Sequence, residues 1–259
     1  MTGAKVTVLG SGTSHGVPLV GCTCAVCRSD DPRDKRWRPS IFIEFPDGFR
    51  VLVDTTPDLR AQALRFNVTR VDAIVFTHSH ADHIMGLDEV RRFNALQKAA
   101  VPCYADARTV RDIRRTFEYV FSPRGQEGGG IPRLELLTIA GAFCLGRHEI
   151  VPVPIFHGPR PIFGFRIGSF AYLTDTNHIP ESSWPLLNGV TLLVLDALRD
   201  RPHSTHFTVA QALEVARRLA PERTYLTHIC HDLPHAATCA RLPAGVELAY
   251  DGLMLELPE

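Results

Sequence analysis

The chain has 259 residues, of which 45% are hydrophobic, enough to build one sizeable core. Its 28 basic and 28 acidic residues give a formal net charge of zero, so the composition carries no strong signal for nucleic acid or an anionic membrane. There is no run of 18 apolar residues, and the N-terminus lacks the apolar segment of a signal peptide. We therefore expect a single cytoplasmic domain spanning residues 1–259, with no membrane span.

The first predicted strand, Lys5 to Leu9, leads into a glycine-rich turn and then into a cysteine-rich loop at residues 21–27. His15, in the turn, either lines a pocket or is an ordinary polar loop residue. The loop has the spacing Cys-x-Cys-x-x-Cys, formed by Cys22, Cys24 and Cys27. Three thiolates can hold one ion, and tetrahedral zinc needs a fourth ligand. With seven cysteines in a reducing compartment, such a cluster indicates metal binding before disulfides.

A predicted hairpin follows, with strands at residues 40–45 and 49–54 around a Pro-Asp-Gly turn. Asp54 ends the second strand. It can cap the helix predicted over residues 57–66, or it can orient a histidine that ligates a metal. The sequence alone leaves both roles open.

The apolar, β-branched run at residues 71–76 predicts a buried strand, and Thr77-His78-Ser79-His80-Ala81-Asp82-His83 follows it directly. Alternate residues of an extended chain point the same way, so His78 and His80 can face one ion together. Asp82 and His83 lie past the strand end and can turn toward a second ion. Imidazole and carboxylate suit zinc, iron or manganese. The alternative, a solvated loop that carries these histidines by chance, is rare directly after a buried strand.

The middle of the chain predicts helices over residues 84–97 and 107–121, with a short strand at 101–105 between them. The glycine-rich segment at residues 124–132 predicts a mobile loop. This loop is either an active-site lid, with Arg124 or Arg133 meeting a phosphate, or a linker.

In the second half, three predicted strands end in metal-capable residues: His157, Asp175 and His228. Asp196 ends a fourth strand, as a cap or as a partner of a ligand. His206 precedes a helix predicted over residues 209–219, whose N-cap is Thr205 or Thr208. Strand runs alternate with helices in both halves, which is compatible with two sheets sandwiched between helices.

The run from His78 to His83 resembles the His-x-His-x-Asp-His signature of the metallo-β-lactamase superfamily. The resemblance implies an α/β fold, the αββα sandwich of two mixed sheets flanked by helices. It also implies two metal sites: His78, His80 and His157 for one ion, and Asp82, His83 and His228 for the other. Asp175 would bridge the two ions, and Asp54 would orient a ligand. A hydroxide shared by the two ions would then attack the substrate, with Asp82 as a catalytic residue.

The cysteine cluster, together with a histidine three residues after His228, is similar to the phosphodiesterases of the PhnP group. That resemblance implies a structural zinc held by Cys22, Cys24, Cys27 and His231. It also implies that His206 contacts the substrate phosphate or donates a proton to the leaving oxygen. The segment at 125–132 departs from this group, which leaves the natural substrate open.

The sequence therefore predicts a hydrolase that cleaves small or cyclic phosphodiesters with two divalent ions, zinc or manganese or iron, and one structural zinc. Its partner would be a small-molecule phosphodiester, and a homodimer stays open. The alternatives are a relative of the PQQ-biosynthesis protein, an RNA nuclease, a thioesterase, or a metal-binding protein without turnover. The RNA nuclease is less favoured because no basic arm is present, and the complete ligand set disfavours the loss of turnover.

Overall fold

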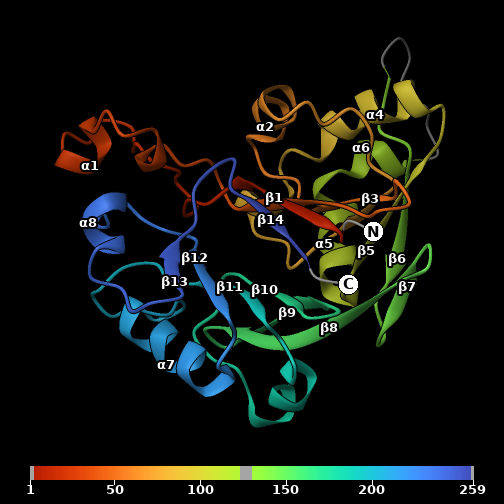
Figure 1. The fold of residues 1–259 in the computed structure, drawn as a ribbon. Helices are drawn as coiled ribbons and strands as arrows, with labels where there is room; N and C mark the ends of the chain where they lie inside the picture. Colours follow the sequence, from red (N-terminus) through yellow and green to blue (C-terminus); the bar gives the residue numbers. More distant parts are fainter. Residues whose placement is uncertain (1–2, 123–129, 258–259) are drawn as a thin grey trace.

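The computed structural model describes residues 3–122 and 130–257, which form two β-sheets stacked face to face with helices on the outside (Figure 1). This is the αββα sandwich predicted from the sequence. Among the described residues each sheet has seven strands. No helix in this part of the chain is long and apolar enough to cross a membrane.

The first sheet has the strand order β14-β1-β2-β3-β4-β5-β6 and mixes parallel and antiparallel pairs. Its strands are β1 Lys5–Gly10, β2 Ser40–Glu44, β3 Arg50–Val53, β4 Ala73–Val75, β5 Val101–Ala105, β6 Leu134–Thr138 and β14 Met254–Glu256. The expected hairpin is present, because β2 and β3 pair antiparallel with Ile41 opposite Val53.

The second sheet has the order β13-β12-β11-β10-β9-β8-β7. Its strands are β7 Phe143–Leu145, β8 His148–His157, β9 Arg160–Ile167, β10 Phe170–Leu173, β11 Leu192–Asp196, β12 Arg223–Thr227 and β13 Val246–Leu248. The last two strands of the chain belong to different sheets, because β13 pairs with β12 and β14 with β1.

Helices cover the outer faces of the two sheets, and α1 lies apart from both sheets in the cysteine-rich loop (Figure 1). They are α1 Ala25–Arg28, α2 Leu59–Arg65, α3 Ala81–Ile84, α4 Val90–Gln97, α5 Ala107–Thr116, α6 Glu118–Phe121, α7 Val209–Leu219 and α8 His235–Cys239, with 3-10 turns η1 Pro32–Asp34, η2 Leu87–Glu89 and η3 Glu181–Leu187. Thr208 is the N-cap of α7 and forms a capping box with Gln211, so the second of the two N-cap candidates is correct.

The core has three layers, and strand β4 shows why its sequence is apolar without interruption. Ala73 and Val75 pack between the sheets, whereas Ile74 faces the cluster under α4 and α5. Because successive side chains of a strand point to opposite faces, a strand covered on both faces must be apolar at every position.

Two predicted helices are broken in the structure. The stretch 84–97 contains the end of α3, the turn η2 and then α4, and the stretch 107–121 divides at Phe117 into α5 and α6. The first break lies at Gly86, where a Cβ would come within 2.0 Å of the carbonyl oxygen of Thr56. Most of the glycine-rich loop predicted over residues 124–132, namely residues 124–129 with Arg124, lies outside the described residues.

The strand order brings the metal-capable residues to one edge of the sandwich. Strands β10, β11 and β12 are parallel neighbours, so their C-terminal ends meet at the same edge. Strand β8 runs in the same direction, because both β8 and β10 pair antiparallel with β9. Residues that are far apart in sequence therefore converge at this edge.

Candidate metal centre

Three histidines form the first ligand group. Ring nitrogens of His78, His80 and His157 all lie within 4.8 Å of one another. His78 is fully buried and His157 is 8% exposed, while His80 is half-buried at the start of α3. The structure thus brings together the three residues assigned to one ion by resemblance.

A second group contains Asp82, His83, Asp175 and His228, again with ligand atoms within 4.8 Å of one another. The two carboxylate oxygens of Asp175 face different imidazoles: Oδ2 lies 3.1 Å from His83 Nε2, and Oδ1 lies 3.1 Å from His228 Nε2. Asp175 also lies within the same limit of His157, which belongs to the first group. Its position between the groups is the one that a bridging carboxylate requires.

The chemistry of these atoms fits divalent cations. Within the described residues, Nε2 of His78, His83 and His228 is buried and has no hydrogen-bond partner. A buried polar atom without a partner is costly, so convergent lone pairs of this kind need a ligand. Two ligand atoms of one tetrahedral ion are about 3.4 Å apart, close to the 3.1 Å separations around Asp175.

The electrostatics of the site also favour bound cations. Burial raises the pKa of the Asp175 carboxyl, but the imidazoles of His228 and His83 outweigh it and hold that pKa well below its usual range. Burial likewise lowers the pKa of His228, yet Asp175 and Asp82 raise it to about 10. Around the first group, burial lowers the pKa of His80 to about 4, which keeps a neutral imidazole available for ligation. The second group therefore attracts positive charge, and the first supplies neutral donors.

Hydrogen bonds behind the ligands fix their tautomers. The fully buried carboxylate of Asp54 accepts from His83 Nδ1 at 2.7 Å and from the backbone N–H of Thr77 at 2.9 Å. His157 Nδ1 donates to the carbonyl of Thr205 at 3.0 Å. Each bond leaves Nε2 of the histidine as a lone-pair donor. Asp54 does not cap α2, so of the two roles considered the orienting one agrees with its contacts.

His206 lies at the rim of both groups. Its Nδ1 is 2.7 Å from Oδ2 of the buried Asp196, and its ring stacks on that of His228 with centroids 4.5 Å apart. A nitrogen of His206 also lies within 4.8 Å of ligand atoms of His157 and Asp175. Asp196 therefore orients His206 toward the space between the ligands.

Three residues of the site adopt a left-handed backbone conformation within two residues of the ends of their strands: Asp54 (φ 64°), Asp175 (φ 57°) and His228 (φ 60°). This conformation costs non-glycine residues about 1–3 kcal/mol each and tends to occur at functional sites. Here it turns each side chain off its strand and into the common site.

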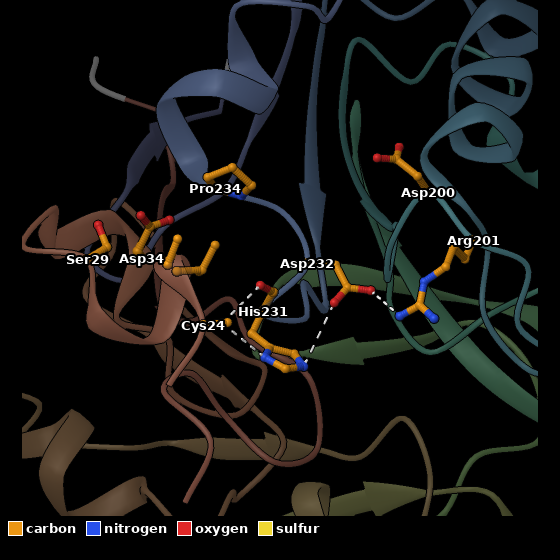
Figure 2. Close-up of a pocket in the computed structure, with 10 residues that line it drawn as sticks. Cys24, Ser29, Asp34, Asp200, Arg201, His231, Asp232 and Pro234 are labelled. Atoms are coloured by element: carbon orange, nitrogen blue, oxygen red, sulfur yellow. Dashed lines mark hydrogen bonds and ion pairs between the residues drawn. The ribbon is translucent and has the colours of Figure 1, made fainter. Parts of the chain in front are cut away.

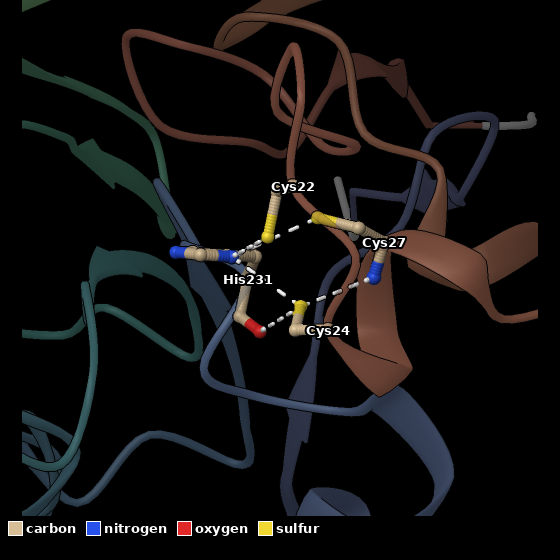
Figure 3. A group of neighbouring side chains, drawn as sticks. All are labelled: Cys22, Cys24, Cys27 and His231. Atoms are coloured by element: carbon tan, nitrogen blue, oxygen red, sulfur yellow. Dashed lines mark hydrogen bonds between the residues drawn. The ribbon is translucent and has the colours of Figure 1, made fainter.

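The cysteine cluster lies apart from the two ligand groups and joins the cysteine-rich loop to the segment after β12 (Figure 3). His231 Nδ1 lies 3.3 Å from the sulfur of Cys22, 3.4 Å from that of Cys24 and 3.7 Å from that of Cys27. A tetrahedral zinc with ordinary bond lengths holds sulfur and nitrogen about 3.6 Å apart. The four residues fit one zinc ion, and they are the set implied by resemblance.

The sequence reasoning did not single out a polar cluster beside His80. Arg160 donates to the hydroxyl of Ser79 at 2.7 Å, and Ser79 donates to Asp112 at 2.5 Å. Arg160 lies directly opposite His157 in the β8–β9 pair. A prediction of that hairpin from the sequence would have placed Arg160 beside the ligand His157. For His15 the structure favours the pocket, because this residue and His206 line the same hollow.

Comparison with known proteins gives a consistent family. The sequence model of a protein family described as the beta-lactamase superfamily domain matches residues 49–229. An octanoyltransferase of Porphyromonas gingivalis is 38% identical over 253 residues, which cover 96% of this chain and 51% of that protein. The chain thus spans about half the length of this relative. A coenzyme PQQ synthesis protein B of Cupriavidus necator is 24% identical, with 98% of this chain and 99% of that protein covered.

Solved structures resemble the whole chain. A crystal structure described as a new diphosphatase from the PhnP family is 48% identical, with a TM-score of 0.92 and coverage of 98% of this chain and 97% of that one. The zinc-bound PqqB from Methylobacterium extorquens has a TM-score of 0.76 at 17% identity, covering 98% and 100% of the two chains. The second likeness concerns the fold alone.

Proposed function

The chain belongs to the metallo-β-lactamase superfamily and is a hydrolase of that fold, and on this basis we propose that it is a phosphodiesterase with a dinuclear metal centre. The bond cleaved would be a P–O bond of a small phosphodiester or of a diphosphate with a substituent on each phosphorus. The observation that carries the proposal is Asp175, which belongs to the second ligand group and also lies within 4.8 Å of His157 of the first group. A carboxylate-held histidine, His206, lies beside it.

The proposed ligands are His78, His80 and His157 for one ion and Asp82, His83 and His228 for the other, with Asp175 shared between them. Zinc and manganese both suit this set, and iron is compatible with it. When bound, the two cations would supply Lewis-acid activation of water and neutralise charge on the phosphate oxygens. A separate zinc in the Cys22, Cys24, Cys27 and His231 site would have a structural role.

The residues of this chain would position the substrate and handle protons. Asp82 lies in the second group and, with Asp175, would set the negative potential that holds the cations. His206 has its Nδ1 bonded to Asp196, so its other nitrogen would donate a proton to the leaving oxygen or bind the phosphate. An aspartate behind a histidine fixes the orientation of the ring and stabilises the imidazolium that this donation requires, as in other acid–base pairs.

The similarity to the diphosphatase of the PhnP family supports phosphate chemistry rather than acyl transfer. The octanoyltransferase name belongs to a protein about twice as long as the part that this chain matches, so it gives little support for acyl transfer here. The substrate partner that we propose is a small molecule with a phosphodiester-type phosphorus.

The test is hydrolysis of bis-p-nitrophenyl phosphate by protein reconstituted with manganese or zinc, with the metal content measured in parallel. We expect metal-dependent turnover, and we expect His206→Ala to lose about 10²- to 10⁴-fold in kcat while its metal content is kept. His148→Ala is the matched control, because this histidine pairs with Asp47 and is in none of the ligand clusters. Full metal content without turnover of any diester would contradict the proposal and favour a role like that of the PQQ synthesis proteins.

A further inference from the structure

A hollow of about 270 Å³ opens beside His206, between the first glycine-rich turn and the loop that follows β11. Its polar lining includes His15, Arg199, Arg201 and His203. None of these residues belongs to the two ligand groups at the strand ends. The volume is slightly below that of pockets for drug-sized ligands, so it suits a small group rather than a polymer.

We propose that this hollow is the leaving-group subsite and that it takes an anionic leaving group, a phosphate monoester. The substrate class is then a diphosphate diester, cleaved between its two phosphorus atoms. This inference rests on the proposed phosphodiesterase function and deepens it.

The hollow lies on the side of the site where a leaving group would depart. His206 lines the hollow and at the same time lies within 4.8 Å of ligand atoms of His157 and Asp175. A proton donor must lie within hydrogen-bond reach of the oxygen that it protonates. If His206 protonates the leaving oxygen, the leaving group lies on the His206 side of the attacked phosphorus, which is where the hollow opens.

The charged residues that line the hollow favour an anion. Two arginines, Arg199 and Arg201, line the hollow together with one acidic residue, Asp232. Asp232 pairs with Arg201 at 2.7 Å. Arg199 instead donates to the backbone carbonyls of Arg201 and Pro202, and no carboxylate of the described residues lies within 4.0 Å of it. One positive charge of the hollow is therefore uncompensated, which favours an anion over a neutral alcohol.

His203 supplies a hydrogen-bond donor to the hollow. Its Nδ1 accepts the backbone N–H of Thr205 at 3.3 Å, so a neutral ring carries its proton on Nε2. Burial and the nearby His206 lower the pKa of His203, which favours the neutral ring. His203 would thus offer an N–H donor 5.0 Å, measured between ring centroids, from His206. A phosphate with several acceptor oxygens can use this donor together with Arg199.

The cysteine cluster is connected to the arginines of the hollow through His231. Figure 2 shows His231, Asp232 and Arg201 in a row, with the Asp232 carboxylate between the imidazole and the guanidinium. The two separations are 3.9 Å to His231 and 2.7 Å to Arg201. Because Arg199 bonds to the carbonyl of Arg201, the cluster that holds His231 also positions the cationic wall. The structural zinc site would therefore hold the leaving-group subsite in shape.

The proposed reaction is a balanced hydrolysis. The oxygen of water bonds to one phosphorus, and the bond from this phosphorus to the bridging oxygen breaks. The electron pair of that bond stays on the bridging oxygen, which leaves as part of a phosphate monoester and receives a proton from His206. The hydroxyl of the water remains on the attacked phosphorus and its second proton passes to solvent, from which His206 regains the proton that it donated. Two phosphate monoesters are formed.

The experiment compares two substrates, P,P′-diphenyl diphosphate and bis-p-nitrophenyl phosphate, on the metal-loaded protein. For Arg199→Gln we expect kcat/KM to fall about 10- to 100-fold with the diphosphate and several-fold less with the nitrophenyl diester, whose leaving group carries no phosphate. Arg199→Lys should recover part of the loss. Arg241→Gln is the control of equal charge change, because Arg241 pairs with exposed Asp200 and does not line the hollow.

Binding of phenyl phosphate, measured by titration calorimetry on the same proteins, gives a readout separate from turnover. The dissociation constant should rise about 10-fold or more in Arg199→Gln and stay near the wild-type value in Arg241→Gln. Equal losses on both substrates with unchanged phenyl phosphate binding would overturn the subsite while leaving the phosphodiesterase proposal intact. If the wild-type protein hydrolysed neither of the two substrates, the proposed function itself would instead be overturned.

Discussion

Replacing Asp54 by asparagine tests how the structure prepares its ligands. Asp54 accepts from the N–H and hydroxyl of Thr77 and from His83 Nδ1. Asparagine keeps one acceptor oxygen but places an NH₂ group where the second oxygen was. To avoid a contact between two donors, His83 must move its proton from Nδ1 to Nε2. That nitrogen lies 3.1 Å from Asp175 and could then no longer ligate an ion.

The expected magnitude follows from this change. Loss of the group that orients a ligand histidine typically costs about 10- to 100-fold in metal affinity, or about 1.4–2.7 kcal/mol. The free energy of unfolding of the metal-free protein should fall by about 1–3 kcal/mol, because one buried donor loses its partner. Competition with a chromophoric chelator measures the affinity, and urea unfolding measures the stability.

Asp251→Asn is the matched control. Asp251 is also buried and accepts from the N–H and hydroxyl of Ser11 and the N–H of Trp37, but no imidazole is among its partners. We expect a similar loss of stability with active-site metal affinity within about 3-fold of wild type, since no ligand tautomer changes. Wild-type metal affinity in Asp54→Asn, or an equal loss in both variants, would refute the tautomer argument.

Three further predictions concern other parts of the fold. Cys24→Ser should lose about one zinc per chain and unfold at lower urea; unchanged zinc by mass spectrometry would exclude the structural site. The backbone N–H of Cys27 lowers the pKa of Cys24 to about 6, so alkylation of Cys24 in metal-free protein should slow as the pH falls through 6; inflection near 9 would contradict this. Gly86→Ala should cost about 1–3 kcal/mol, because its Cβ would meet the Thr56 carbonyl at 2.0 Å, whereas Gly141→Ala, with open space, should be near neutral by urea unfolding.

The sequence predicted the parts of the fold that follow local patterns. The uninterrupted apolar run of β4 predicted a strand covered on both faces, and its continuation into His78 and His80 predicted two side chains on one side. The N-terminal capping residue of α7 was among the two proposed from their position before the helix. In the structure it is Thr208, which forms a capping box with Gln211 three positions later.

What the sequence could not predict depends on contacts across long separations. The break near Gly86 depends on the carbonyl of Thr56, and nothing local to the helical pattern signals it. The choice between two roles for Asp54 needed the distance to His83, which is 29 positions away. Likewise, His15 became a neighbour of His206 only once β1 and β11 were placed in their two sheets. Spacing within one segment carries no information about such neighbours.

Titration of metal-depleted protein tests the central claim, a dinuclear site bridged by Asp175, most directly. Turnover of bis-p-nitrophenyl phosphate is followed as manganese or zinc is added, and bound metal is counted at each step. We predict that about three ions bind per chain, one of them lost in Cys24→Ser, and that turnover rises with the last two. Full turnover with a single ion outside the cysteine cluster, or an unchanged ion count and rate in Asp175→Ala, would contradict the account.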